Sequence, residues 1–226
     1  MAEPAEAFFA RLRASLARSG DWRQPEDPDA ARSPEPFVLP VDSEGAVENF
    51  VREFTAVSGE VHRVTAAGLT AKIVELAVAR SAKSYASWAT PLLSDPALHQ
   101  ALAGAGVTRL PLGTDAAREG LRNLEIGLSE PDCGVAETGS LVLIPGPGRS
   151  RLATAMARYH FAVLPVARVV TSLTEVPARL RAAKDGNGQM RSDAVLVTGP
   201  SRTGDIEGQI VLGAHGALEL HLLLVG

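Results

Sequence analysis

Short strand-like runs alternate with helical patterns between residues 47 and 110, and this alternation is the strongest constraint on how the chain folds. Apolar residues recur at helical spacing through Val47–Phe54 and through Leu69–Ala77, and a further helix is predicted after Pro96. The strands predicted between these helices are Val61–Val64, Ser84–Trp88 and Val107–Leu110. Strands separated by helices favour right-handed crossovers and a mainly parallel sheet, so the predicted fold class is α/β.

The second half of the chain carries two closely spaced apolar runs, Cys133–Ala136 and Ser140–Ile144. The segment Glu137-Thr138-Gly139 lies between them, as a tight turn or bulge between two strands requires. Further strands are predicted at Phe161–Pro165, Arg168–Val170, Ala194–Thr198 and Leu218–Val225. A chain of 226 residues with this pattern commonly forms one domain, and we predict a single α/β domain over residues 37–226.

The first 36 residues have a different character from the rest. Helical spacing of apolar residues predicts an amphipathic helix over residues 1–18, which we expect to pack on the body or on a second subunit. These apolar residues are Ala5, Phe8, Phe9, Leu12 and Leu16. Prolines at positions 25, 28, 34 and 36 stand among charged residues, so residues 19–36 can neither continue a helix nor pair inside a sheet. We interpret them as a tether.

Charge, hydropathy and cysteine content narrow the functional classes. The net charge is −4 and the basic residues are scattered, so no nucleic-acid partner is expected. No apolar run has the length of a signal peptide or a membrane span, which predicts a cytoplasmic protein. Cys133 is the only cysteine, so one chain can form neither a CxxC pair nor an all-thiolate cluster, and we expect a buried thiol. Without HxxxH or HxH spacing, no metal site is predicted.

The segment after Thr198 carries the densest set of polar and small residues. Gly199-Pro200 turns the chain, and Ser201 or Thr203 is predicted to cap a helix. The first turn of that helix would hold Asp205 and Glu207. One interpretation is simply a well-capped helix. The alternative is an anion site at the end of the strand, to which Gly199, Ser201, Arg202 and Thr203 would offer backbone N–H groups, hydroxyls and a guanidinium.

Two further residues are candidates for catalysis. His215 stands between small residues, Gly213 and Gly216 among them, so a ligand or a backbone segment can approach the imidazole closely. Glu137 could project into the same crevice as a general base, a nucleophile or a ligand contact, or it could accept backbone N–H groups. His160 and His221 lie beside apolar strand residues and are expected to be structural.

Three stretches together resemble the lactate-utilisation protein C family, the stand-alone LUD domain. They are CGVAETGSLVL (residues 133–143), the RYHFAVLP run with the VVTSLTE that follows it, and GPSRTGDIEGQIVLGAHGALELHLLLV (residues 199–225). The resemblance spans about residues 45–226. It implies a Rossmann-like fold of the kind found in glucosamine-6-phosphate deaminase, ribose-5-phosphate isomerase, CoA transferases and 5-formyltetrahydrofolate cyclo-ligase.

The resemblance also implies a function. The family is associated with a three-protein system that oxidises L-lactate to pyruvate, in which iron–sulfur and cysteine-rich partner proteins carry the clusters and this chain binds no cofactor. The positions that match the family motifs are Glu137, Thr138, Gly139, Ser201, Arg202, Asp205, Glu207, Gly213, His215 and Gly216. Under this first hypothesis, Arg202 and His215 hold a substrate carboxylate or shape a docking surface. Under the second, the chain is an independent transferase or ligase-like enzyme, with Glu137 as nucleophile or base and residues 201–205 binding a phosphate, CoA or nucleotide.

Overall fold

The computed structural model describes residues 5–18, 42–112, 120–189, 191, 193–206 and 209–226. Contacts divide the chain into two units, Met1–Pro36 and Phe37–Gly226, and each is described by itself. In the first unit, helix α1 covers Ala5–Arg18, where a helix is predicted. The predicted tether, residues 19–36, lies outside the described residues. No helix in the described part of the chain is long and apolar enough to cross a membrane.

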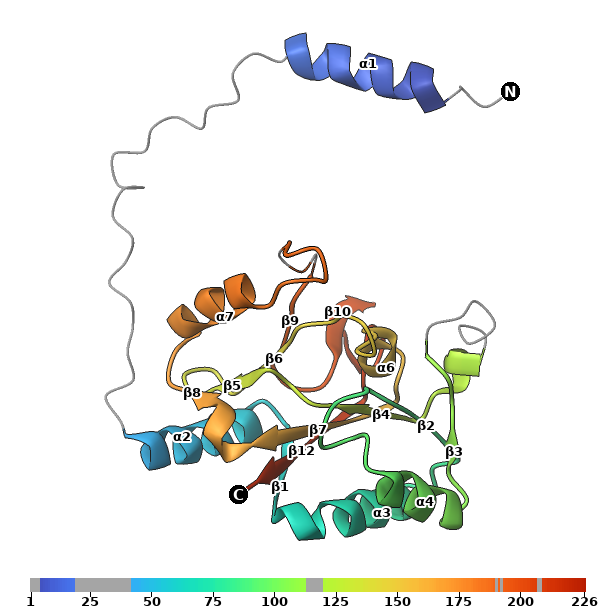
Figure 1. Cartoon of the computed structure of the whole chain (residues 1–226), viewed down its shortest axis with the longest axis vertical. Coiled ribbons are helices and arrows are strands. Elements are labelled where there is room, and N and C mark those ends of the chain that lie inside the picture. The colour runs from blue at the N-terminus through green and yellow to red at the C-terminus, as the bar shows by residue number, and fades with distance from the viewer. Residues whose placement is uncertain (1–4, 19–41, 113–119, 190, 192, 207–208) are drawn as a thin grey trace. The chain divides into compact units, whose positions relative to one another are not determined.

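A parallel sheet of six strands is the centre of the second unit, in the order β1-β12-β7-β4-β2-β3 (Figure 1). The strands are β1 (Glu60–Val64), β2 (Ser84–Ser87), β3 (Thr108–Arg109), β4 (Ile126–Ser129), β7 (Tyr159–Pro165) and β12 (Glu219–Val225). Every neighbouring pair is parallel, which confirms the predicted α/β class. Strand β12 lies between β1 and β7, so Leu222 faces Val61 on one side and Ala162 on the other.

Helices cover the two faces of this sheet and bury separate apolar cores. On one face lie α3 (Leu69–Ala79) and α4 (Pro96–Gly104), as Figure 1 shows, and their Ile73 and Leu102 pack with Phe161. On the other face lies α2 (Ser43–Ala56), whose Phe50 and Phe54 pack with strand residues such as Leu222. Asp42 caps α2 by accepting the backbone N–H of Gly45 at 2.8 Å. The predicted apolar spacing therefore identified the buried side of α2 and of α3.

A second, four-stranded sheet has the order β8-β5-β6-β9. It consists of β5 (Cys133–Val135), β6 (Ser140–Leu143), β8 (Val169–Val170) and β9 (Val195–Val197). Strands β5 and β6 are antiparallel, and the N–H of Gly139 donates to the C=O of Val135 at 2.9 Å, so the predicted tight turn at residues 137–139 is confirmed. Helix α7 (Val176–Ala182) packs on this sheet through Val176, beside Cys133.

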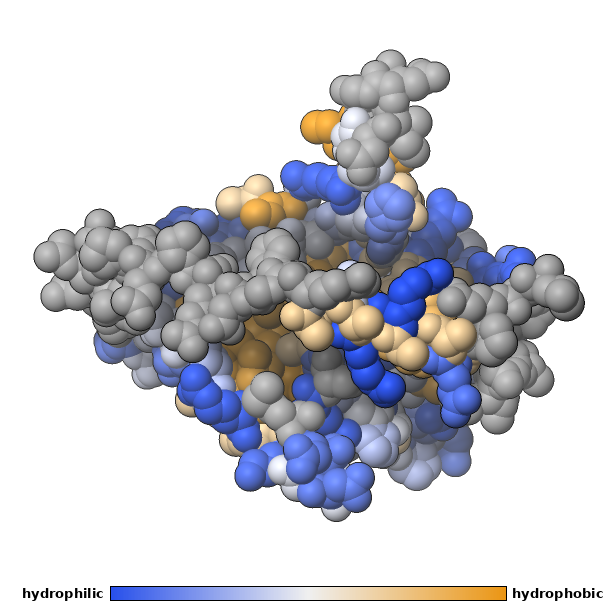
Figure 2. All heavy atoms as spheres, turned by 90° about the horizontal axis from the view of Figure 1, so that it is seen from above, coloured by the Kyte–Doolittle hydropathy of each residue, from blue (hydrophilic) through white to orange (hydrophobic). Residues whose placement is uncertain are grey.

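The other helices of the described chain are short. They are α6 (Leu152–Ala155) and the 3₁₀ helices η1 (Ala66–Gly68), η2 (Leu121–Asn123), η3 (Val166–Arg168) and η4 (Leu173–Glu175). Most large apolar residues of the described chain lie inside, and the surface seen in Figure 2 is correspondingly mixed, with strongly hydrophilic side chains beside smaller hydrophobic areas.

The prediction of a helix after Gly199-Pro200 is wrong. The structure has an antiparallel hairpin there, with strands β10 (Arg202–Ile206) and β11 (Gln209–Leu212). Thr203 does not cap a helix but pairs with Val211 across the hairpin, and it is buried. Asp205 is part of β10, whereas Glu207 falls outside the described residues. The β-branched residues and two glycines of this segment disfavour a helix, and the cap-like spacing of hydroxyls and acids does not offset that preference.

Strand β4 was not predicted. Its sequence, Ile126-Gly127-Leu128-Ser129, is short and contains a glycine, which normally weakens a strand. All four residues are buried, and a Cβ atom at Gly127 would lie 1.8 Å from the carbonyl oxygen of Ala153. The glycine is therefore required by the close approach of α6 to the sheet.

Candidate functional site

The segment that follows β9 closes on itself around Ser201. The N–H of Ser201 donates to the C=O of Ala217, and the N–H of Gly213 donates to the C=O of Ser201, both at 2.9 Å. The N–H of His215 donates to the Oγ of Ser201 at 3.2 Å. The structure thus brings together Ser201, Gly213 and His215, three of the residues predicted from the sequence.

A cavity of about 270 Å³ opens beside this loop. Four predicted residues line it, namely Gly199, Ser201, His215 and Gly216. His160 also contributes to the wall, and its Nε2 lies 2.7 Å from the Oγ of Ser129. Burial lowers the pKa of His160 to about 4, so this imidazole is neutral near pH 7. The expected structural role of His160 agrees with its buried hydrogen bond.

Gly199 has a backbone conformation that its neighbours require. Its φ is 85°, and a Cβ atom there would lie 2.4 Å from the carbonyl oxygen of Val57. Only glycine combines this torsion with so close an approach to the C-terminal end of α2. The turn at Gly199-Pro200 therefore fixes the path that the chain takes from β9 along the wall of the cavity.

The guanidinium of Arg202 binds the residues that follow α2. Its Nη2 donates to the C=O of Val57 at 3.1 Å and to the Oγ of Ser58 at 2.5 Å. Arg202 lines neither of the two cavities that His215 lines. These contacts tie the base of the β10–β11 hairpin to the residues that follow α2.

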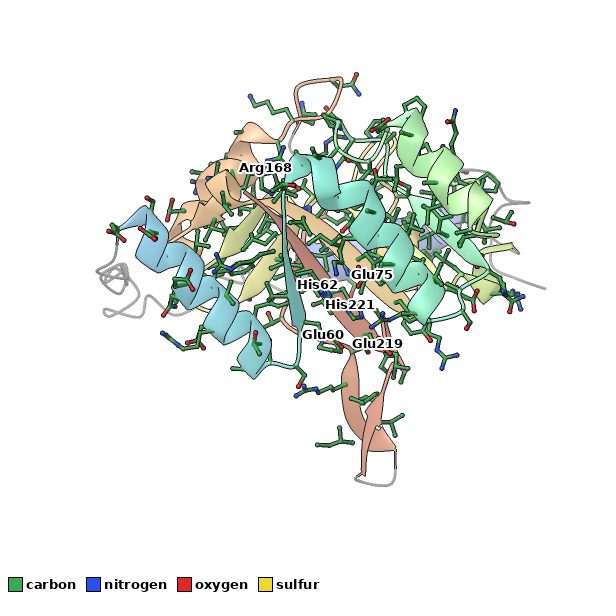
Figure 3. All side chains as sticks on the ribbon, turned by 90° about the horizontal axis from the view of Figure 1, so that it is seen from below. Glu60, His62, Glu75, Arg168, Glu219 and His221 are labelled. Carbon is green, nitrogen blue, oxygen red and sulfur yellow. The ribbon has the colours of Figure 1, made fainter. Side chains whose placement is uncertain are left out.

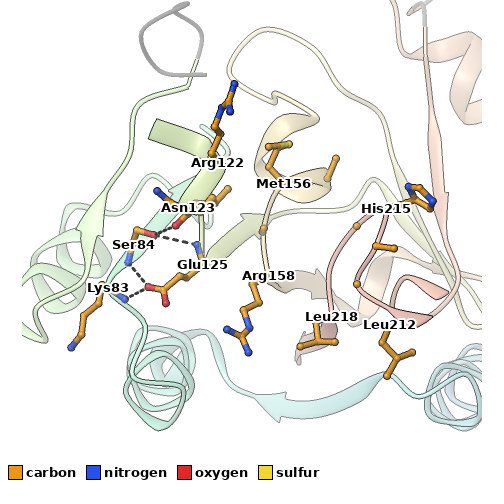
Figure 4. Close-up of a pocket in the computed structure, with 16 residues that line it drawn as sticks. Lys83, Ser84, Arg122, Asn123, Glu125, Met156, Arg158, Leu212, His215 and Leu218 are labelled. Carbon is orange, nitrogen blue, oxygen red and sulfur yellow. Dashed lines mark hydrogen bonds between the residues drawn. The ribbon is translucent and has the colours of Figure 1, made fainter. Parts of the chain in front are cut away.

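His215 also lines a larger cavity of about 1070 Å³ (Figure 4). Three cationic residues line it, Lys83, Arg122 and Arg158. The carboxylate in the same wall, Glu125, accepts the backbone N–H groups of Lys83 and, at 3.2 Å, of Ser84. Three cations against this one carboxylate leave an excess of positive charge in the cavity, which suits an anionic ligand.

Glu137 lies apart from His215 and lines neither cavity. Its Oε2 accepts the Oγ hydroxyl of Ser172 and the backbone N–H of Leu173, both at 2.9 Å. The carboxylate of Glu137 therefore accepts hydrogen bonds, which is one of the alternatives considered for it. These bonds hold the start of η4 and not the turn in which Glu137 lies. The two residues predicted to be catalytic do not share a cavity.

A row of hydroxyl groups nevertheless connects the two predicted motifs. The Oγ1 of Thr138 lies 2.7 Å from the Oγ of Ser140, which lies 2.7 Å from the Oγ1 of Thr198. Thr198 directly precedes Gly199, so the turn at residues 137–139 supports the start of the cavity-lining loop. Thr138 therefore contributes to positioning and not to the wall of the cavity.

Sequence reasoning missed Glu130, which follows β4. Its side chain is 2% exposed, pairs with Arg168 at 2.8 Å and accepts the N–H of Leu92 at 3.3 Å. Parallel sheets bind ligands beyond the carboxyl ends of their strands, where the strand order reverses. The order reverses here between β2 and β4, because the chain passes from β2 out to β3 before it returns. The pair Ser129-Glu130 at the end of an apolar run was the available signal.

Comparisons with known proteins agree with the resemblance found in the sequence. The family model described as LUD domain matches residues 47–225. A protein named lactate utilization protein C from Shouchella clausii is 25% identical over 227 residues, covering 97% of this chain and 96% of that protein. A protein of the same name from Halalkalibacterium halodurans is 24% identical over 232 residues, covering 100% and 99%.

One solved structure has a similar fold. It is the crystal structure of a DUF162 family protein from Deinococcus radiodurans, with a TM-score of 0.58 and 18% sequence identity. The match covers 83% of this chain and 100% of that chain. At this level of identity the likeness concerns the fold, and it agrees with the Rossmann-like α/β architecture.

Proposed function

Because the chain belongs to the LUD domain family, we propose that it takes part in L-lactate utilisation in the cytoplasm. Its role is that of an accessory subunit in a multi-protein, iron–sulfur-dependent system that oxidises L-lactate to pyruvate. The observation that carries this proposal is the similarity to two proteins named lactate utilization protein C, which extends over 97% and 100% of this chain.

The electron carriers are assigned to partner proteins. Clusters held by thiolates need several cysteines, and Cys133 is the only cysteine of this chain. Cys133 is fully buried, and burial raises its pKa to about 11, so the thiol is poorly suited even to a shared cluster. Iron–sulfur and cysteine-rich partners would therefore transfer the electrons.

The surface around β9 and the β10–β11 hairpin is where we expect such a partner to dock. It exposes large apolar side chains, with Ile210 77% and Leu212 50% exposed on the hairpin and Leu196 47% exposed on β9. Arg202 supports this role, because it ties the hairpin to Val57 and Ser58.

The second part of the proposal concerns the larger of the two cavities that His215 lines. Lys83, Arg122 and Arg158 give it the charge that a small carboxylate ligand needs, and L-lactate and pyruvate are both carboxylates. In this arrangement the ligand would bind next to the loop that follows the hairpin, so that binding and docking involve neighbouring residues.

An anaerobic affinity pull-down tests the accessory role. The tagged chain is recovered from the source organism grown on L-lactate, partners are identified by mass spectrometry, and lactate-dependent dye reduction is assayed with and without the chain. We expect an iron–sulfur partner and activity that depends on this chain.

Matched variants test the docking surface in the same assay. Ile210→Glu is expected to lose the partner, whereas Val78→Glu, at a 56% exposed position on α3, is expected to keep it. Recovery of no iron–sulfur partner, together with unchanged dye reduction, would remove the accessory role.

The second hypothesis, an independent transferase or ligase-like enzyme, depends on Glu137. The bonds from Ser172 and Leu173 already occupy this carboxylate in a supporting role. If the purified chain transfers acyl or phosphoryl groups, Glu137→Gln is expected to abolish the reaction, and unchanged rates would exclude Glu137 as nucleophile or base.

A further inference from the structure

Two copies of a Glu-x-His pattern lie on neighbouring parallel strands, Glu60-Val61-His62 on β1 and Glu219-Leu220-His221 on β12. Residues two apart point to the same face of a strand, so each pattern places a carboxylate and an imidazole on one face. The register pairs Glu60 with His221, which brings the two patterns side by side on the face that α3 covers. Figure 3 shows the four side chains gathered there.

The distances among three of these groups fit a metal ion. The Nε2 of His62 lies 3.2 Å from the Nδ1 of His221, and the Oε2 of Glu60 lies 3.3 Å from the same Nδ1. The three possible ligand atoms all lie within 4.8 Å of one another. Tetrahedral zinc with ligands at about 2.0–2.1 Å separates neighbouring ligand atoms by about 3.3 Å.

The other nitrogen of His221 has the partner that a metal-binding histidine usually has. Its Nε2 lies 3.0 Å from the Oε2 of Glu219, and the Nε of Arg80 donates to that same carboxylate at 2.7 Å. A proton on Nε2 that is donated to Glu219 leaves the lone pair of Nδ1 directed toward His62 and Glu60. A carboxylate that orients a metal-binding imidazole in this way is the common arrangement at zinc sites.

The cluster has one closed side and one open side. His221 is fully buried, and its ring contacts that of Phe161 edge-on at 5.2 Å, whereas the side chain of Glu60 is 58% exposed. Glu60 and Glu219 line a small cavity of about 150 Å³, which gives an ion or a fourth ligand room to enter.

Nearby cations have carboxylate partners of their own. Lys72 pairs with Glu75 at 2.8 Å, and Arg80 pairs with Glu219 at 2.7 Å while its Nη2 remains 3.9 Å from Glu60. The nearest guanidinium therefore hydrogen-bonds the orienting carboxylate of Glu219 and makes only a longer ion pair with Glu60.

We propose that Glu60, His62 and His221 bind a divalent transition-metal ion of the zinc type, with Glu219 as the positioning residue that orients His221. Two imidazoles and one carboxylate leave a fourth coordination position for water or a ligand oxygen from the adjoining cavity. None of the three proposed ligands belongs to the proposed docking surface, although Leu212 and Arg202 of that surface line the adjoining cavity. The metal site does not depend on the role in lactate utilisation.

Titration of the metal-free full-length chain with Zn²⁺ and with Co²⁺ tests the proposal. Calorimetry with Zn²⁺ is expected to give one ion per chain, and Co²⁺ is expected to give the visible absorption of a four-coordinate N/O site. Glu60→Gln and His62→Ala are expected to weaken binding by more than about 100-fold, and Glu219→Gln by about 10- to 100-fold. His99→Ala, which removes a histidine outside the cluster, is the matched control and should bind as the wild type does.

Glu60 is exposed and His62 is only partly buried, so these variants should fold, and circular dichroism checks that they do. Zn²⁺ is expected to raise the melting temperature of the wild type and not that of His62→Ala. Absence of saturable binding to the wild type, or binding that His62→Ala leaves unchanged, would overturn the proposal.

Discussion

Gly139 allows a quantitative test of whether the motif Glu137-Thr138-Gly139 is needed for packing. Its φ is 65°, and a Cβ atom there would lie 2.4 Å from the backbone nitrogen of Phe54 and 2.5 Å from the carbonyl carbon of Glu53. The left-handed conformation costs a non-glycine residue about 1–2 kcal/mol. The overlap is with helix backbone that must move by about 1 Å, which adds about 1–3 kcal/mol.

Gly139→Ala is therefore expected to lower the free energy of unfolding by about 4 kcal/mol, and the melting temperature by roughly 8–16 °C for a chain of this size. Two other glycines separate the contributions. Gly106 has a φ of 79° and no atom near its Cβ position, so Gly106→Ala isolates the backbone strain of about 1–2 kcal/mol. Gly104 ends α4 with neither constraint, so Gly104→Ala is expected to be neutral or slightly stabilising.

Thermal and urea unfolding followed by circular dichroism measure the three variants. If Gly139→Ala is no less stable than Gly106→Ala, then α2 does not pack against the turn as described, and the steric argument is refuted. If the expected order is found, the glycine of this motif is explained by packing, without a role in chemistry.

Three further perturbations have defined outcomes. The pKa of His160 is about 4 instead of 6.5, so as the pH falls the unfolded chain takes up a proton before the folded one. The free energy of unfolding should then decrease between pH 6.5 and 4, by at most about 3 kcal/mol. Urea unfolding at about pH 7 and pH 5 measures this decrease, and the free energy of unfolding of His160→Gln should depend less on pH. Cys133 is buried with a pKa of about 11, so a thiol reagent should leave it unmodified in the folded protein and modify one thiol per chain in denaturant; rapid labelling without denaturant would contradict this. Arg168→Ala should lower the free energy of unfolding by about 3 kcal/mol, because it leaves the carboxylate of Glu130, which is 2% exposed, without its partner. Glu130→Gln should cost less, because Arg168 is 39% exposed and can reach water. Equal losses in denaturant titrations would contradict the difference in burial.

Much of the fold could be predicted because its patterns are local. The spacing of Val47, Phe50 and Phe54 identifies α2, and continuous apolar runs identify β7 and β12. Strand β4 could not be predicted, since its glycine is explained only by α6, which lies about 25 residues further along the chain. The β10–β11 hairpin was mistaken for a helix because a hydroxyl followed by acids resembles an N-terminal cap.

The features of the candidate site also divide into those that follow from local sequence and those that depend on distant segments. The turn at Gly199-Pro200 could be predicted from its residues, whereas the hydrogen bonds that join Ser201 to Gly213 and His215 depend on the β10–β11 hairpin, which was not predicted. The contacts of Glu137 with Ser172 and of His62 with His221 depend on strand pairing across long stretches of chain. No pattern within one segment reveals which residues a strand will face in another.

The position of β12 also governs when the main sheet can be completed. Strand β1 pairs with β12 and with no other strand of the described sheet, although 159 residues separate Glu60 from Glu219. While a nascent chain is emerging from the ribosome, β1 and one edge of β7 therefore remain without hydrogen-bond partners until residues 219–225 have left the exit tunnel. Unpaired edges of apolar strands are prone to associate with other chains. Cellular yield should consequently depend on protecting these two edges during synthesis, a requirement that the equilibrium stability of the finished molecule does not reveal.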